Sequence, residues 1–277
     1  MSAAPVQGPA GNPLCPPEWL ALREPADAAA RSAALADAVA AVLSPGPLLV
    51  RDLGCGTGSM GRWLAPRLPH DQHWVLHDRD PVVLSRAVAA LPPGVTAEAG
   101  PGDLTGLGPA DLAGTSLVTA SALLDLLTAQ ETDALAASCA AARAPALLTL
   151  SVSGRVRFHP AEPLDAGLAA AFDAHQRREA GGRRMLGPDA PAVAAATFAR
   201  HGATVRTADT PWRLGPDRPA LLREWLAGWL DAACVQDPAL AVHVPGYLQR
   251  REAALAAGTL RVEVGHVDLL AVPGERS

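Results

Sequence analysis

Lysine and isoleucine are absent from the 277 residues, and Asn12 is the only asparagine. Alanine, glycine, proline and arginine are abundant instead, which is the skew that GC-rich codons produce, so the preference for arginine over lysine carries little functional information. Long basic runs are also lacking, and the formal net charge is −5. Because nucleic-acid binding rests largely on neutralising phosphates, we expect no nucleic-acid partner.

The cysteines offer neither metal nor disulfide chemistry. Cys15, Cys55, Cys139 and Cys234 show no C-x-x-C spacing, which argues against a zinc site and against a disulfide framework. A reduced, intracellular protein is the default for such a chain. No apolar run reaches the length of a membrane span, and no basic segment followed by an apolar one opens the chain. We therefore expect a cytoplasmic protein with no metal and no membrane partner.

The stretch 48–59 is the centre of the sequence. An apolar run, typical of a buried strand, ends at Asp52, and Gly54, Gly56 and Gly58 follow at alternate positions before a helix starts near residue 59. A strand, a glycine-rich turn and a helix together bring backbone N–H groups up to a ligand. Glycine suits such a turn because a Cβ would block close approach and because the turn often needs a positive φ.

Two ligands are compatible with these glycines. Asp52-x-Gly54-x-Gly56-x-Gly58 resembles motif I of the class I S-adenosylmethionine (SAM) dependent methyltransferases. Gly56-x-Gly58-x-x-Gly61 also spells the dinucleotide fingerprint, although a single match of that kind is weak. In the dinucleotide register Asp52 has no role, and its carboxylate would repel a pyrophosphate while suiting a cationic amino group. We favour SAM and keep NAD as the alternative.

Two further aspartates fit the same resemblance. Asp78 ends the second predicted strand about 20 residues past the glycines, where an acidic side chain accepts hydrogen bonds from ribose hydroxyls. Asp80 precedes Pro81 and is expected to cap a helix. Asp103, in a Gly-Asp-apolar triplet, matches the position that contacts adenine in the family. The expected cofactor-binding residues are Asp52, Gly54, Cys55, Gly56, Gly58, Asp78, Arg79, Asp103, Leu104 and Ser121.

Strands and helices alternate through the first half of the chain, which predicts a doubly wound α/β fold. We expect strands at 48–52, 73–78, 95–99, 115–121, 146–151, 203–207 and 259–272. A helix start is expected at Pro25, and residues 28–43 are expected to form one helix ahead of the first strand. The resemblance implies a mostly parallel seven-stranded sheet with an antiparallel last strand, and helical insertions in the C-terminal half. The expected units are a flexible lead-in (1–16), a SAM-binding core with an N-terminal helical cap (17–154), acceptor-binding or lid helices (155–257), and the last strand with the tail (258–277).

Catalytic and acceptor-binding residues are less clearly marked. A hydroxyl or amine acceptor needs a general base, for which His175, His159 and Asp125 are the candidates, with His77 behind them. Acceptor contacts are expected from four residues near the ends of predicted elements, namely Trp19, Arg23, Leu124 and Trp212. A carboxylate acceptor would need no base and would instead favour Arg157, Arg177 or Arg213.

The resemblance implies an enzyme that moves a methyl group from SAM to an oxygen or nitrogen of a small molecule, or to a carboxylate, in specialised metabolism, leaving S-adenosylhomocysteine (SAH). SAM is the expected cofactor, a small-molecule methyl acceptor is the expected partner, and the protein is expected to be a monomer or a homodimer. Two alternatives remain. One is a non-catalytic protein that retains the SAM pocket for regulation, and the other is an NAD(P)-dependent oxidoreductase.

Overall fold

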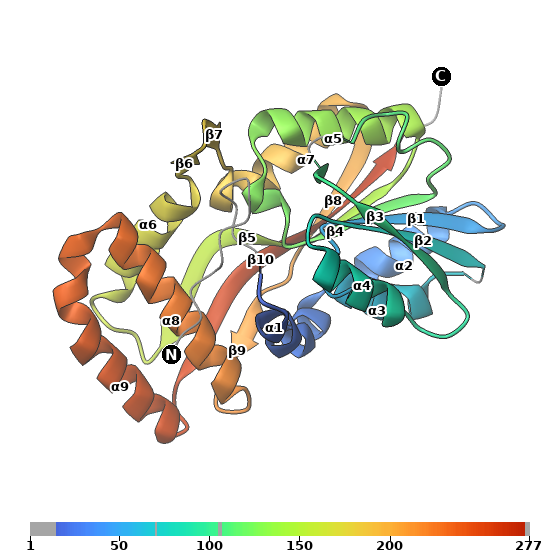
Figure 1. Cartoon of the computed structure of the whole chain (residues 1–277). Coiled ribbons are helices and arrows are strands. Elements are labelled where there is room, and N and C mark those ends of the chain that lie inside the picture. Colours follow the sequence, from blue (N-terminus) through green and yellow to red (C-terminus); the bar gives the residue numbers. More distant parts are fainter. Residues whose placement is uncertain (1–14, 70, 105–106, 275–277) are drawn as a thin grey trace.

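The computed structural model describes residues 15–69, 71–104 and 107–274, and its centre is a single eight-stranded sheet (Figure 1). The lead-in predicted over residues 1–16 lies outside the described residues except for its last two positions. Along the sheet the strands follow the order β3 (Thr96–Pro101), β2 (Gln72–Asp78), β1 (Leu48–Leu53), β4 (Leu117–Ser121), β5 (Ala146–His159), β10 (Arg261–Pro273) and β8 (Ala203–Asp209).

The predicted doubly wound, mostly parallel arrangement is confirmed. Strands β1 to β5 run parallel, and the last strand β10 lies antiparallel to both β5 and β8. The sheet has one strand more than predicted, because β9 (Trp212–Leu214) pairs with β10. The reason is length. β10 has 13 residues and β8 only seven, so β10 extends beyond β8 and its free edge pairs with the next segment.

Helices cover both faces of this sheet. Side chains of α2, α3 and α4 pack in one apolar core, and those of α5 and α7 pack in another on the opposite face (Figure 1). None of the helices among the described residues is long and apolar enough to cross a membrane. The helices are α1 (Pro17–Ala30), α2 (Ala33–Val42), α3 (Ser59–Leu64), α4 (Pro81–Ala89), α5 (Ala129–Ala142), α6 (Asp165–Gln176), α7 (Ala190–Arg200), α8 (Pro219–Gln236) and α9 (Val244–Ala256).

Shorter elements connect these helices and strands. Single 3-10 turns follow α3 and β4 and precede α7 and α9. Residues 179–184 form a small antiparallel hairpin. These elements are η1 (Ala65–Arg67), η3 (Leu124–Leu126), η4 (Gly187–Asp189), η5 (Pro238–His243), β6 (Glu179–Ala180) and β7 (Arg183–Arg184).

The single helix predicted over residues 28–43 is wrong. The structure has two helices, and Pro25 lies inside the first of them rather than at a start. Helix α1 ends after Ala30 because Arg31 has an extended backbone (ψ 140°). Ser32 then caps α2 by accepting a hydrogen bond from the backbone N–H of Leu35. The N–H of Ser32 donates to Asp268 at 2.8 Å, so a buried carboxylate far along the chain holds this break in place.

A third apolar core lies away from the parallel strands. It is built by α6, α8 and α9 against the far ends of β5, β9 and β10, and these helices form the lobe opposite α3 and α4 (Figure 1). Arg251 is completely buried within it, stacked between Phe158 and Tyr247, and it bonds the carboxylate of Asp165 and the carbonyl of Pro160. The charge of Arg251 is therefore satisfied inside an aromatic environment.

Replacing Arg251 by methionine should lower the free energy of unfolding by about 3–5 kcal/mol, because the carboxylates around it lose their buried partner. The adjacent Arg250 provides the control, since its side chain is 60 % exposed and pairs with Glu162 at the surface. Arg250→Met should cost less than about 1 kcal/mol. Urea denaturation of both variants tests this, and equal losses would contradict a special role of the buried guanidinium.

Candidate functional site

The predicted strand, glycine turn and helix are present between β1 and α3. Gly54, Gly56 and Gly58 all have positive φ, at 65°, 52° and 84°. A Cβ on Gly56 would lie 3.2 Å from the side chain of Leu20, and one on Gly58 would lie 3.1 Å from Ala87. Glycine is thus required by the backbone conformation and also by the close approach of α1 and α4 to the loop.

Asp52 is the last residue but one of β1, and it has no exposed surface. One of its carboxylate oxygens accepts a hydrogen bond from the Thr119 hydroxyl at 2.7 Å, and the other, Oδ2, is buried without a partner among the described residues. Burial raises the pKa of Asp52 to about 7. A buried acceptor left unsatisfied is costly, and a cationic ligand group would satisfy it.

Asp78 ties the end of β2 to the glycine turn. Its Oδ2 accepts from the backbone N–H of Gly56 at 2.9 Å, and its Oδ1 accepts from the N–H of Asp80 at 3.0 Å. Asp80 in turn accepts from Val82 N–H at 2.8 Å and caps α4, as predicted. A carboxylate has about four acceptor positions, so Asp78 retains capacity for ligand hydroxyls.

Two connected cavities lie over this turn at the carboxyl ends of β1, β2 and β4. The outer cavity, of about 190 Å³, includes Asp78 and Asp103, and the inner cavity, of about 50 Å³, includes Asp52. They share a wall formed by Leu20, Arg23, Gly54, Gly56, Ser121 and Ala122.

Nine of the ten residues expected to bind the cofactor line one or both cavities, and Gly58 lines neither because it caps α3. Cys55 lies at the inner cavity with its thiol toward the Gly56 carbonyl, and burial raises the pKa of that thiol. The nine are Asp52, Gly54, Cys55, Gly56, Asp78, Arg79, Asp103, Leu104 and Ser121.

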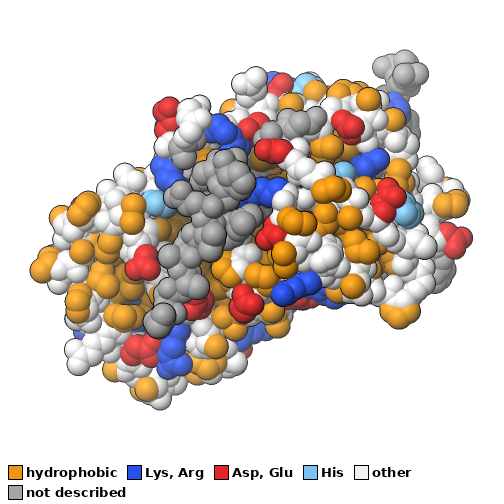
Figure 2. All heavy atoms as spheres, viewed as in Figure 1, with side chains coloured by type: hydrophobic (Ala, Val, Ile, Leu, Met, Phe, Trp, Pro, Cys, Tyr) orange, Lys and Arg blue, Asp and Glu red, His pale blue; other side chains and the backbone are white. Residues whose placement is uncertain are grey.

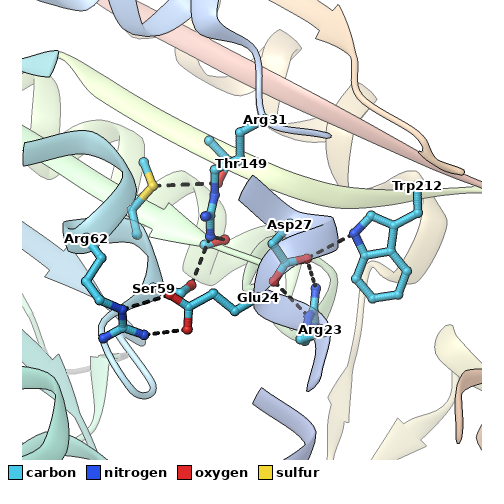
Figure 3. Close-up of polar contacts among 10 residues, drawn as sticks. Arg23, Glu24, Asp27, Arg31, Ser59, Arg62, Thr149 and Trp212 are labelled. Carbon is cyan, nitrogen blue, oxygen red and sulfur yellow. Dashed lines mark hydrogen bonds and ion pairs between the residues drawn. The ribbon is translucent and has the colours of Figure 1, made fainter. Parts of the chain in front are cut away.

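Sequence reasoning missed the cation beside this site. Arg31, at the break between α1 and α2, is only 4 % exposed and donates to the hydroxyl of Ser59 at 3.0 Å (Figure 3). It also donates to the hydroxyl of Ser121 at 3.0 Å. Ser59 begins α3 and Ser121 ends β4, so one guanidinium joins the N-terminal helices to both sides of the inner cavity. No local signal marks Arg31, because its partners lie 28 and 90 residues away.

Helix α1 supplies a second, partly buried network. Asp27 accepts from Arg23 and from the indole N–H of Trp212, and Glu24 pairs with Arg62 of α3 at 2.6 Å (Figure 3). Arg62 also donates to a backbone carbonyl of the glycine turn. Through these contacts α1 is attached to the turn on one side and to β9 on the other.

Of the residues expected to contact an acceptor, only Arg23 lines the cavities. Two expectations are wrong. Trp212 is 3 % exposed and is covered by Arg23, so no planar acceptor can stack on it. Leu124 is 1 % exposed in the core beneath α5, and its neighbour Leu123 faces the outer cavity instead. Trp19 contacts Trp212 edge-on and Arg23 by its face, at the outer side of the same stack.

The candidate bases are widely separated. Asp125 lies in η3, shortly after β4, and lines none of the cavities described here; burial raises its pKa to about 6, while a backbone hydrogen bond and the nearby Arg23 lower it. His175 lies on α6, where burial lowers its pKa, and it lines none of the cavities described here. His77 is buried in β2 against Arg51, and burial lowers its pKa too.

His159 is misplaced for the predicted role. It is exposed at the far end of β5 and lines a separate surface cavity of about 460 Å³ that shares no residue with those over the glycine turn. Arg157 and Arg213 line that cavity as well, and both pair with Glu263. Arg177 is bonded by both its nitrogens to Asp189.

A larger cavity, of about 780 Å³, lies beside the outer one. Its wall combines leucines of the segment between β3 and β4, and leucines on either side of η3, with residues of α5, the β6–β7 hairpin and α7. Leu104, Leu123, Leu127 and Arg183 border both this cavity and the outer one. The guanidinium of Arg183 is held by Glu131, at 2.9 and 2.7 Å.

The distribution of charged side chains and of possible metal ligands was compared with that expected of a nucleic-acid or metal site in the described part of the chain. On the face in Figure 2, acidic and basic side chains are interspersed, with no continuous basic surface. Within the part of the chain that the structure describes, no group of three or more histidine, cysteine or carboxylate side chains is placed to hold a metal ion.

Comparison with solved structures identifies the fold. A candidate methyltransferase from Bacillus halodurans C-125 is similar over 87 % of this chain and 98 % of its own, with a TM-score of 0.51 at 13 % identity. The YcgJ protein from Bacillus subtilis is similar over 88 % and 98 %, with a TM-score of 0.50 at 12 % identity. The fold is that of the class I methyltransferases. No protein-family model and no curated protein sequence matches the chain.

The methyltransferase fold explains why the cavities lie where they do. The chain passes from β1 outward to β2 and β3, and then returns to place β4 on the other side of β1. The crevice where strand order reverses is the preferred ligand site of open α/β sheets. The glycine turn, Asp52 and Ser121 all lie at that crevice, on the adjacent ends of β1 and β4.

Asp52→Asn should show the cost of the buried charge. Because the folded-state pKa of Asp52 is raised from 3.8 to about 7, the wild type loses stability as the pH rises from about 4 through 7. The variant carries no such charge, so its Tm relative to wild type should increase between pH 5 and pH 8. Thermal unfolding at both pH values measures this, and a pH-independent difference would contradict the raised pKa.

Proposed function

We propose that this protein is a SAM-dependent methyltransferase that transfers a methyl group to an oxygen or nitrogen of a small molecule, or to a carboxylate, and releases SAH. The observation that carries the proposal is the arrangement of Asp52, Asp78 and Asp103 along two connected cavities at the glycine turn of a methyltransferase fold. Each of these carboxylates suits a different part of SAM.

The inner cavity suits the charged end of such a ligand, since the free oxygen of Asp52 can accept from an ammonium group. Asp78 borders the outer cavity with acceptor capacity left for the two ribose hydroxyls. Asp103 and Leu104 lie further along the same cavity, where a carboxylate and an apolar side chain can receive the exocyclic amine and the ring of adenine.

SAM supplies an electrophilic methyl group on a sulfonium, and the protein's task is to hold that group in line with the acceptor atom. Orientation of this kind accounts for about 7–11 kcal/mol of barrier lowering in favourable cases. Ser121 and Arg23 line both cavities where the amino-acid end meets the nucleoside end. We place the acceptor atom on that side, near Asp125, which interacts electrostatically with Arg23.

An NAD-dependent oxidoreductase is less well supported. In the dinucleotide register Gly61 would be the last glycine, and it lies within α3, where a Cβ would overlap the side chain of Leu91. Gly61 is therefore required for the packing of α3, whichever cofactor binds, and does not by itself indicate a dinucleotide. Asp52, however, would place a carboxylate beside the pyrophosphate, which is repulsive.

Ligand binding tests the proposal directly. The wild type should bind SAH in calorimetry and should show no binding of NADH. Asp78→Ala should weaken SAH binding by about 1–3 kcal/mol, the usual loss on removing a charged hydrogen-bond partner. Asp37→Ala is the control, because Asp37 is exposed on α2 and lines neither cavity, and it should leave SAH affinity unchanged. Binding of NADH but not SAH would overturn the proposal, and SAH binding without turnover of any screened acceptor would favour a regulatory protein.

Asp125 should determine the pH profile if the acceptor must be deprotonated. With a pKa of about 6, its carboxylate becomes a base as the pH rises through 6, so turnover should increase from pH 5 to pH 7. Asp125→Asn should abolish that increase and leave SAH affinity unchanged. The rate of SAH release, with an acceptor found by screening, is the measurement. Asp133→Asn, on the surface of α5, should retain the wild-type profile, and an unaltered profile in Asp125→Asn would exclude this base.

A further inference from the structure

The larger cavity, of about 780 Å³, has no part in the proposed methyl transfer. Asp78, Arg23 and Ser121 line the cavities over the glycine turn, and none of them lines this one. Its volume is in the range of sites that bind small molecules, about 300–1,000 Å³. The cavity is therefore large enough for a ligand of its own.

The cavity exists because one connection within the sheet has no helix. Parallel strands are usually joined by a crossover helix that covers the face of the sheet. Between β3 and β4, the described residues of the segment 102–116 form turns and include no α-helix. The apolar side chains that such a helix would cover instead face a hollow. Its wall is mainly leucine and includes Leu104, Leu112, Leu123, Leu127, Leu135 and Leu186.

The charged side chains at this cavity, three arginines and two carboxylates, are unequal in number. Arg183 is bonded to Glu131 at 2.9 and 2.7 Å, and Arg177 is bonded to Asp189 at 2.7 and 2.8 Å. The exposed Arg184 makes no hydrogen bond or ion pair with a described residue, and it acts on Asp189 only through space. The described residues thus leave one positive charge without a counter-charge.

The two paired arginines also retain N–H donors. Arg177 and Arg183 each use Nε and Nη2 for their carboxylate, and neither Nη1 donates to a described residue. A guanidinium has five N–H donors, so an anion bound at Arg184 finds further donors on the same wall. An apolar wall with a surplus cation suits a ligand that has an apolar body and one anionic group.

The larger cavity and the outer cavity share a wall at the nucleoside end of the proposed cofactor site. Leu104 and Leu123 border both cavities. Arg183 also borders both, and it interacts electrostatically with Asp103. Ligands in the two cavities would therefore contact the same side chains from opposite sides. Whichever ligand binds first orders these side chains, so the second ligand binds at a smaller entropic cost.

We infer that the larger cavity binds an amphipathic anion, a molecule with an apolar body and one carboxylate or similar group, and that this ligand and SAM strengthen each other's binding. The site itself follows from the cavity and its charges, whereas the coupling rests on the proposed function. The ligand is an effector and not the methyl acceptor, because Ser121 and Arg23, beside the expected methyl group, lie outside the wall of this cavity.

Two probes that differ in charge test the site. Calorimetry of the full-length protein with decanoate and with decan-1-ol compares an anionic and a neutral ligand of the same chain length. Arg184→Gln should weaken decanoate binding about threefold to fivefold, as expected for an exposed charge pair, and should leave decan-1-ol binding unchanged. Arg206→Gln is the matched control and should change neither affinity, because Arg206 is exposed on β8 and lines none of the cavities described here.

A second pair of variants tests the apolar wall. Ala134 is exposed on α5 and lines the cavity, so Ala134→Trp fills part of the cavity without disturbing the core. This variant should weaken the binding of both probes about tenfold or more. Ala141 is exposed on the same helix but does not line the cavity, so Ala141→Trp should leave both affinities unchanged.

The coupling is measured in the wild type with both ligands. Saturating SAH should strengthen decanoate binding about fivefold, the lower end of usual coupling between sites. Saturating decanoate should strengthen SAH binding by the same factor, because coupling between two bound ligands is reciprocal.

Wild-type protein that does not bind decanoate would overturn the site, and so would equal effects of each variant and its control. Decanoate affinity that does not respond to SAH would overturn the coupling. Formation of methyl decanoate from SAM and decanoate would make this ligand the acceptor and overturn the effector role. Binding of decanoate without any binding of SAH would contradict the proposed function and leave the site standing.

Discussion

The carboxylate of Asp268 is the interaction on which the geometry of the site depends. It is fully buried, and it accepts from the backbone N–H groups of Ser32 and Leu150 and from the Thr210 hydroxyl, at 2.7–2.9 Å. These three groups belong to the break between α1 and α2, to β5, and to the connection from β8 to β9. Leu150 has a positive φ of 57°, and the buried hydrogen bond stabilises that strained backbone. Arg31 directly precedes Ser32, so Asp268 also determines where that cation lies.

Helix α1 combines two functions because its faces differ. Leu20 and Arg23 line the cavities over the glycine turn, whereas Ala26 and Leu22 pack in the core that α6, α8 and α9 build. The helical lobe and the crevice therefore share one element. A ligand that shifts α1 would move both the glycine turn and the helical lobe, because Glu24 joins α1 to Arg62 beside the turn and Asp27 joins it to Trp212 of β9.

Sequence reasoning identified the residues whose role is local. The glycine turn, the cap at Asp80 and the aspartates near the ends of β1 and β2 follow from apolar runs and from residues that only certain backbone conformations accept. The same reasoning placed Trp212 and Leu124 at an acceptor site, and the structure buries both. An aromatic or apolar side chain after a strand can face either the crevice or the core, and the residue pattern alone does not distinguish the two directions. His159 failed for a related reason, because β5 continues far beyond the predicted end and carries it away from the crevice.

The sequence by itself determined the first five strands of the sheet, the glycine turn and the carboxylates around it, because each depends on neighbours within a few residues. Only the tertiary structure decided that Arg31 contacts Ser59 and Ser121, that Asp27 binds Trp212, and that Ser32 binds Asp268, across separations of 28 to 236 residues. Such buried polar contacts leave no periodic pattern. A polar side chain can be buried only where folding brings it a partner, and that partner is known only once the distant strands and helices have packed.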